Sequence, residues 1–261
     1  GGLLDLMLLT RLARGRPKPG SGPPAEAAWG GLDVFYAFMF LLFMEAFIFV
    51  SQDFARALMG SEGKVPDALR VSLSIVRDVA VAYFVWSIVK ARYGQGILEL
   101  GLRSKRFFAH VRDGVLGYIA MLPPLLIAFA ALAAFVTRFQ VQAAPQGVVQ
   151  IYLKDSTSPY LVGLTIFVAL VGPVLEEVFF RGFAYGGLRG KFGPFAAAVV
   201  SSAAFAALHM HWVAFIPIFM LGLFLAYLYE RSGSLVPSIT AHALHNSIMV
   251  ALTLGFKGLS S

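Results

Sequence analysis

Long apolar runs separated by short polar connections dominate the pattern of this chain. Seven runs approach the length of about 20 residues that a helix needs to cross a bilayer core of about 30 Å. They are residues 34–50, 71–89, 114–136, 160–180, 195–209, 212–229 and 235–254. Because only helices and closed barrels satisfy every backbone polar group in lipid, we predict an all-α, polytopic integral membrane protein. We expect about seven transmembrane helices that form a bundle with a central cavity.

The N-terminal segment differs from the rest. Residues 1–13 are apolar but too short to span a bilayer, and residues 14–30 are rich in Gly, Pro and Arg, as is typical of a linker. We therefore divide the chain into an N-terminal stub and linker, residues 1–30, and a single transmembrane helical domain, residues 31–261. An eighth span, if there is one, would have to come from residues 1–13.

Composition and charge agree with a membrane protein. The chain is 58% hydrophobic and 13% charged, where a soluble domain has about 25% charged residues. The net charge of +7 does not indicate nucleic-acid binding, because the basic residues lie in short connections beside the apolar runs, as the positive-inside rule predicts. With no cysteine, the sequence excludes a disulfide framework, thiolate chemistry and a cysteine metal site.

The distribution of Lys and Arg predicts the topology. Residues 90–113 carry six of them and are expected to be cytoplasmic. Residues 51–70 and 139–158 are then expected to be loops on the opposite side. Alternation places the N-terminus in the cytoplasm. We expect a protein of the bacterial inner membrane whose partners are the lipid bilayer and a hydrophobic substrate.

Charged residues inside the apolar runs need an explanation, because they are costly at bilayer depth and usually face the protein interior or a wet cavity. The fourth run holds Glu176, Glu177 and Arg181. Glu177 and Arg181 are four residues apart and can pair on one helix face, so we interpret them as a structural ion pair. Glu176 points about 100° away and has no partner in its own turn, so we interpret it as functional.

Further polar residues lie in two later runs. His209 ends the fifth run, and His242, His245 and Asn246 lie in the seventh. A carboxylate in apolar surroundings suits a general base or acid near neutral pH. A neutral imidazole can orient water, move a proton or bind a metal. An amide can donate a hydrogen bond to an oxyanion. Together these are the parts of a hydrolase that activates water to cleave an amide bond.

Some residues remain without a clear assignment. Glu45 could pair across helices with Arg77 or with Arg181, and the roles of His211 and His245 stay undecided. The relative depth of the candidate residues also sets a condition. Glu176 and His209 can meet only if the fourth helix continues well past Arg181 and the fifth is short or tilted.

Three motifs occur in order on separate runs. They are Glu-Glu-x-x-x-Arg at 176–181, Phe-x-x-x-His at 205–209 and His-x-x-x-Asn at 242–246. Their combination resembles the CAAX protease and bacteriocin-processing (CPBP, Rce1-like) family of intramembrane proteases, in particular its bacterial members. The motif-bearing core is then about residues 159–254.

The resemblance implies a role for each motif residue. Glu176 would be the catalytic glutamate that activates water together with His209, and His242 and Asn246 would stabilise the oxyanion. Glu177 and Arg181 would brace the first motif. The implied function is an intramembrane endopeptidase that hydrolyses a peptide bond of a membrane-anchored or hydrophobic peptide or protein.

Two alternatives remain open. The family has been described both as metalloproteases and as metal-independent glutamate proteases, and we favour metal-independent chemistry. If the protein is a metalloenzyme, a Zn²⁺ ion would be bound by Glu176, His209 and His242. The sequence contains no His-Glu-x-x-His motif. The competing class is a non-enzymatic membrane protein, either a small proton-coupled transporter with a relay of Glu and His or a peptide-binding scaffold without catalysis.

Overall fold

The computed structural model describes residues 23–59, 66–102, 105–142, 147–154 and 160–260. Every regular element in these ranges is a helix, which confirms the all-α class. The stub at residues 1–13 that could supply an eighth span lies outside the described residues.

The elements fall into three kinds of helix. The α-helices are α2 (Gly31–Met59), α3 (Asp67–Tyr93), α4 (Phe107–Phe139), α5 (Gly147–Lys154), α6 (Tyr160–Ile166), α7 (Gly172–Glu177), α8 (Gly186–Leu208), α9 (Phe215–Ser232) and α10 (Val236–Ser260). Two 3₁₀ helices are η1 (Ile97–Leu100) and η4 (Trp212–Ala214). Two π-helices, η2 (Phe167–Val171) and η3 (Val178–Tyr185), flank the short helix α7.

Six helices in the described part of the chain are long and apolar enough to cross a membrane. One of them, Tyr160–Leu208, has 49 residues, about 70 Å at 1.5 Å per residue, which is more than twice the thickness of a bilayer core. It breaks at Gly193, whose φ of 78° and ψ of 166° are not helical and which precedes Pro194. The fourth and fifth expected runs are therefore two arms of one bent element, and the first arm continues past Arg181 as the site requires.

Two expected loops are partly helical. Residues 51–70 were expected to be a loop, but α2 extends to Met59 and α3 begins at Asp67. Residues 139–158 contain α5, in which Ile151 and Tyr152 are buried among hydrophobic residues of α6 and α10. Both predictions of a loop are wrong at these places. Helix α5 packs against α6 and α10, whereas apolar residues in the extensions of α2 and α3, such as Leu58 and Leu69, stay exposed.

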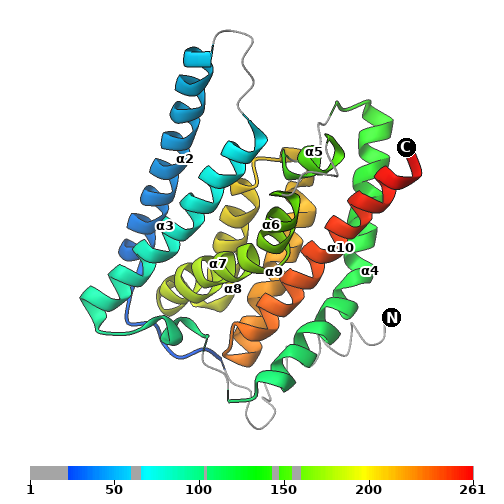
Figure 1. Cartoon of the computed structure of the whole chain (residues 1–261). Coiled ribbons are helices and arrows are strands. Elements are labelled where there is room, and N and C mark those ends of the chain that lie inside the picture. The colour runs from blue at the N-terminus through cyan, green and yellow to red at the C-terminus, as the bar shows by residue number, and fades with distance from the viewer. Residues whose placement is uncertain (1–22, 60–65, 103–104, 143–146, 155–159, 261) are drawn as a thin grey trace.

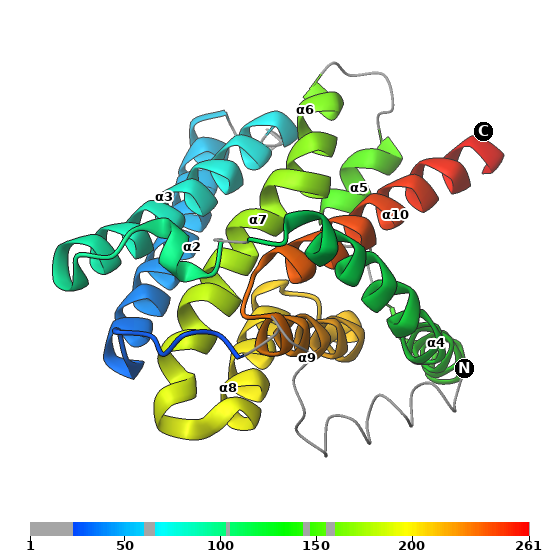
Figure 2. The same cartoon turned by 90° about the horizontal axis from the view of Figure 1, so that it is seen from below.

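The helices form a bundle with two flanks and a centre. Helices α2 and α3 lie side by side on one flank, and α4 and α10 contact each other on the other (Figure 1). The bent element of α6 to α8 and helix α9 occupy the centre between them, as the view from below also shows (Figure 2). Helices α3 and α10 both contact α7, so the segment with the two glutamates lies between the flanks.

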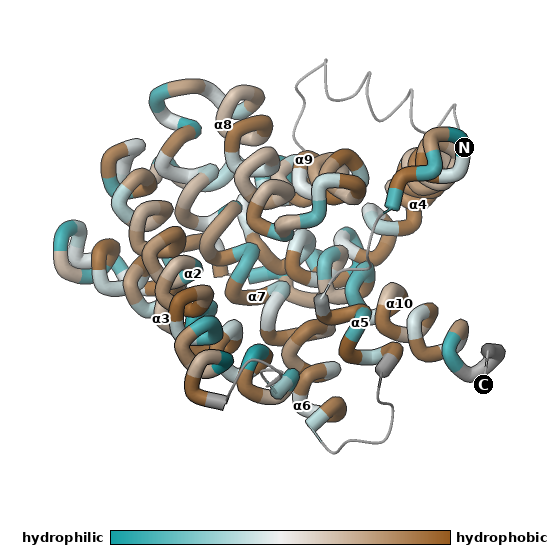
Figure 3. The backbone as a smooth tube through the Cα atoms, turned by 90° about the horizontal axis from the view of Figure 1, so that it is seen from above, coloured by the Kyte–Doolittle hydropathy of each residue, from teal (hydrophilic) through white to brown (hydrophobic). Residues whose placement is uncertain are grey.

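The outer surface is apolar, as lipid requires. Side chains such as Phe43, Phe49, Ile127 and Val162 are more than 60% exposed on their helices. Hydrophobic residues follow the outer helices along their length, while hydrophilic residues also occur in the interior beside α7 (Figure 3). A water-soluble protein rarely exposes so continuous an apolar surface. The chain is an integral membrane protein.

Small residues bring the central elements close together. A Cβ on Gly182 in η3 would lie 2.5 Å from the carbonyl oxygen of Leu100 in η1, and one on Gly114 in α4 would lie 2.5 Å from that of Pro237 in α10. Such close approach of helix backbones is typical of membrane proteins. It holds η3 and α10 in place around the polar residues of α7.

Candidate active site

A buried ion pair lies at the centre of the polar cluster. Arg181 Nη1 donates a hydrogen bond of 2.8 Å to Glu177 Oε1, and neither side chain is exposed. Arg181 also donates to the backbone carbonyl of Gly222 in α9 at 3.1 Å, and its guanidinium lies 4.6 Å from the ring centre of Phe205. The expected pairing of Glu177 with Arg181 is confirmed. It fastens the first motif to α8 and α9.

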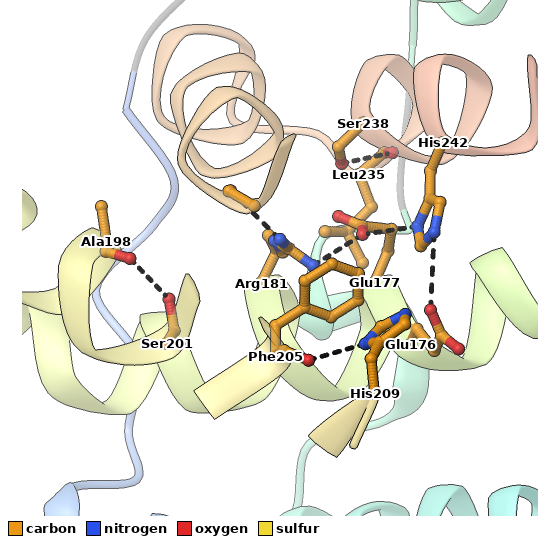
Figure 4. A network of polar contacts seen from close by, with 11 residues as sticks. Glu176, Glu177, Arg181, Ala198, Ser201, Phe205, His209, Leu235, Ser238 and His242 are labelled. Carbon is orange, nitrogen blue, oxygen red and sulfur yellow. Dashed lines mark hydrogen bonds and ion pairs between the residues drawn. The ribbon is translucent and has the colours of Figure 1, made fainter. Parts of the chain in front are cut away.

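His242 of α10 bridges the two adjacent glutamates. Its Nδ1 lies 3.0 Å from Glu177 Oε1, and its Nε2 lies 3.5 Å from Glu176 Oε2. Figure 4 shows the imidazole between the two carboxylates. Glu176 has no partner in its own turn, as expected. His242 of α10 approaches Glu176 Oε2, but this buried oxygen accepts no hydrogen bond from the described residues. Neighbouring residues of a helix point about 100° apart, and an imidazole with two ring nitrogens can face both directions.

His209 has a defined tautomer. It follows the last residue of α8, and its Nδ1 lies 2.8 Å from the carbonyl oxygen of Phe205. A carbonyl only accepts, so Nδ1 carries the hydrogen and the neutral ring presents its lone pair at Nε2. The ring of Phe205 packs edge-on against His209 and His242, with centroid distances of 4.6 and 5.6 Å. Figure 4 shows His209 beside Glu176.

Asn246 lies one turn after His242 in α10. Its Nδ2 donates to the carbonyl oxygen of Val168 in η2 at 2.9 Å. The carbonyl of Val168 lies in a π-helical segment, where the hydrogen bonding of a regular α-helix is altered. One amide hydrogen of Asn246 is used in this way, and the second remains for a ligand.

The four candidate catalytic residues share one cavity. Glu176, His209, His242 and Asn246 all line a cavity of about 700 Å³ that reaches from α2 and α3 to α9 and α10. The size is that of a small-molecule or peptide side-chain site. The three sequence motifs therefore converge in space.

Other residues noted in the sequence also line this cavity. His211 accepts a hydrogen bond from the backbone of Ala214 at 3.2 Å and so caps η4. His245 lies 3.2 Å from the hydroxyl of Tyr118 in α4. Glu45 forms an ion pair with Arg77, which settles which of the two arginines it meets.

Sequence reasoning gave no role to Phe205 and Tyr118. Phe205 is in contact with Arg181, His209 and His242, and the Phe-x-x-x-His spacing was the signal that could have singled it out. Tyr118 had no such signal, because a single tyrosine in an apolar run says nothing about its partner on another helix.

In the alternative with Zn²⁺, the metal ligands would be Glu176, His209 and His242. Within the described ranges, no group of three or more His, Asp or Glu residues is arranged so that it could hold a metal ion. Both ring nitrogens of His242 face carboxylates, and His209 uses Nδ1 for a backbone carbonyl.

Comparisons with known proteins point to one family. Residues 158–248 match the model of the family described as type II CAAX prenyl endopeptidase Rce1-like. The chain is 32% identical over 91 residues to the "Putative membrane peptidase YdiL" of Bacillus subtilis (strain 168), a match that covers 35% of this chain and 37% of that protein. No solved structure matches the chain. The matched segment contains all four candidate catalytic residues, and over this segment the chain is similar to the Rce1-like CAAX prenyl endopeptidases.

Proposed function

We propose that the protein is an intramembrane endopeptidase that hydrolyses a peptide bond of a membrane-associated peptide or protein, with a water molecule activated by Glu176 and His209. The observation that carries this proposal is the convergence of Glu176, His209, His242 and Asn246 on one cavity. The family match supports it, since that family consists of endopeptidases. The site would act in a bacterial inner membrane, with the N-terminus of the chain in the cytoplasm.

Glu176 and His209 would position and activate the water. The lone pair at His209 Nε2 accepts a hydrogen bond from it, because Nδ1–H is held by Phe205. The Glu176 side chain is 31% exposed and lines the cavity, so one carboxylate oxygen can reach the water. A positioned general base of this kind typically contributes a factor of about 10²–10⁴ in rate.

Attack and collapse can be written with these side chains alone. As the water oxygen bonds to the carbonyl carbon, Glu176 accepts one proton of the water and the carbonyl oxygen becomes an oxyanion. The second amide hydrogen of Asn246 donates to that oxyanion. Glu176 then returns the proton to the amide nitrogen as the C–N bond breaks, which releases an amine and a carboxylic acid and regenerates the carboxylate.

His242 would hold the base in place. The sequence motif suggested an oxyanion donor, but both ring nitrogens face the glutamates, at 3.0 Å from Glu177 and 3.5 Å from Glu176. From this position the imidazole limits the orientations that are open to the Glu176 side chain. Glu177 and Arg181 orient the ring through the buried pair.

Cleavage by variants of the full chain tests the proposal. The parent, Glu176→Gln, His209→Ala and Asn246→Ala are reconstituted in liposomes and given a library of membrane-tethered peptides, with products identified by mass spectrometry. We expect losses of about 10²–10⁴ in kcat for the first two variants and about 10²–10³ for the third.

Asp53→Asn serves as the matched control, because Asp53 is an exposed residue of α2 in an ion pair with Arg56 at 2.8 Å. It should cut like the parent. The proposal fails if Glu176→Gln and His209→Ala fold and cleave like the parent. If these variants instead lose a proton flux that the parent supports across the liposome membrane, the cavity belongs to a carrier.

A further inference from the structure

A second group of charged residues lines the same cavity. It consists of Glu45 from α2 and Arg77 and Asp78 from α3. These residues lie outside the segment 158–248 that matches the family model. They also lie apart from the catalytic motifs in sequence, and α3 brings them to the cavity through its contact with α7.

Arg77 binds both carboxylates of this group. Its Nη1 donates to Glu45 Oε1, and its Nε and Nη2 approach Asp78 Oδ1 at 2.8 and 2.7 Å. Each carboxylate thus uses one oxygen for Arg77. Among the described residues, no hydrogen-bond donor contacts Glu45 Oε2 or Asp78 Oδ2. Arg77 therefore holds two carboxylates close together while it leaves one acceptor on each.

The group carries one more negative charge than a structural ion pair needs. Two carboxylates face one guanidinium, and an unbalanced charge at bilayer depth is costly and is normally retained for function. The side chains of Glu45, Arg77 and Asp78 are 35%, 23% and 18% exposed, so they open onto the cavity and are not sealed in the protein. Arg70, which also lines the cavity, does not alter this balance, because it pairs with Asp67 at 3.4 Å.

The chemistry of the group selects an organic cation. A divalent metal would need at least three suitable ligands, and the described residues contain no group of three or more His, Asp or Glu that could hold one. An ammonium or guanidinium group needs fewer acceptors and forms strong hydrogen bonds with carboxylate oxygens. A peptide in the cavity with its scissile bond at Glu176 would pass this group, since Glu176, Glu45 and Asp78 line the same space.

We propose that Glu45 and Asp78, held by Arg77, form a subsite of the cavity for a lysine or arginine side chain of the substrate. The inference rests on the proposed peptidase function and names the class of substrate that this function would prefer. The catalytic residues act on the peptide bond, and the charged group of α2 and α3 selects the sequence around it.

Paired peptides test the subsite. Two tethered peptides with blocked ends, which differ only by lysine or norleucine at one position, are compared for each position near the cleaved bond. We expect the parent to show a kcat/KM at least about tenfold higher for lysine at one position, mostly through KM. Glu45→Gln and Asp78→Asn, each nearly isosteric, should each reduce that ratio several-fold, and the control Asp53→Asn should preserve it.

The subsite proposal is overturned if the parent shows no preference for lysine. It is also overturned if the folded variants Glu45→Gln and Asp78→Asn keep the parent's ratio of kcat/KM values for lysine over norleucine. Neither result affects the proposed peptidase function. The reverse failure is also distinguishable. If Glu176→Gln cleaves like the parent or nothing is cleaved, the proposed peptidase function fails, and binding of the same peptide pair with N-methylated amide bonds then decides the subsite. The subsite is supported if the lysine peptide binds with a Kd about tenfold lower than the norleucine peptide and the Asp78→Asn variant loses this difference. Equal Kd values for the two peptides reject the subsite.

Discussion

A single arginine connects the fold of this protein with its candidate chemistry. Arg181 is fully buried, contacts Glu177, the backbone of Gly222 and the ring of Phe205, and thereby joins η3, α9 and α8. Removal of one member of a buried ion pair leaves the other charge without compensation. For that reason the role of Arg181 can be tested by stability alone, without any substrate.

We expect Arg181→Met to lower the free energy of unfolding by about 3–5 kcal/mol. The double variant Arg181→Met with Glu177→Gln should recover part of that loss, because it also removes the uncompensated carboxylate. Thermal unfolding of the purified protein in detergent measures both. Arg56→Met removes the exposed partner of Asp53 and should cost less than about 1 kcal/mol. A double variant no more stable than Arg181→Met would contradict the pairing as described.

Phe205 should matter for catalysis beyond its share of stability. Its ring packs against His209 and His242 and lies 4.6 Å from the guanidinium of Arg181. Phe205→Leu keeps an apolar side chain but removes the flat surface that orients both imidazoles. We expect about 10–100-fold lower kcat with KM little changed, because small displacements of catalytic groups have effects of that size. Phe195→Leu, at an 81% exposed position of the same helix, is the control and should leave kcat unchanged.

At the scale of elements, α7 is the unusual one. It has only six residues and lies between two π-helices, η2 and η3. π-helical turns are rare and often occur at functional sites, because they change the direction of side chains and free backbone carbonyls. Here η2 provides the carbonyl of Val168 that binds Asn246, and η3 carries Arg181.

The contact between α4 and α10 sets the position of His242 and Asn246. A Cβ on Gly114 would lie 2.5 Å from Pro237 O and 2.8 Å from Thr240 Cβ. We therefore expect Gly114→Ala to separate the two helices, with a clear loss of thermal stability and of cleavage. Gly163→Ala is the matched control, since nothing lies within 4 Å of a Cβ there, and it should be neutral or slightly stabilising. Equal behaviour of the two variants would show that the close approach is unimportant.

At the scale of the whole molecule, α4 offers a test of the predicted topology. This helix has 33 residues, about 50 Å, so its two ends lie on opposite sides of a bilayer core of about 30 Å. The basic residues before it predict that its first end is cytoplasmic. The parent has no cysteine, which makes each introduced cysteine a unique label.

We expect a Lys105→Cys variant to react with a membrane-impermeant maleimide only after the cells are opened. A Gln142→Cys variant, beyond the other end of α4, should react in intact cells. Quantitative mass-tag labelling of the two variants measures this. The opposite pattern would reverse the predicted orientation and place the N-terminus outside.

The apolar runs and the three motifs were sufficient to predict the helical class and the four residues that share the cavity. The periodicity of a regular helix could not predict the π-helices around α7, and the contact of His242 with Glu177 was not predicted either. Asp78 was visible as a charge in an apolar run, but its position in the cavity depends on how α3 packs against α7. Helix α5 was missed because its eight residues are too few to produce a periodic signal.

The cavity is built from two separate parts of the chain, with the catalytic motifs between residues 158 and 248 and the charged group on α2 and α3. With the proposed subsite on α2 and α3, mutations in these helices would change which peptides are preferred while the catalytic motifs stay unchanged. Relatives recognised by the shared segment alone would then be alike in reaction and free to differ in what they cut.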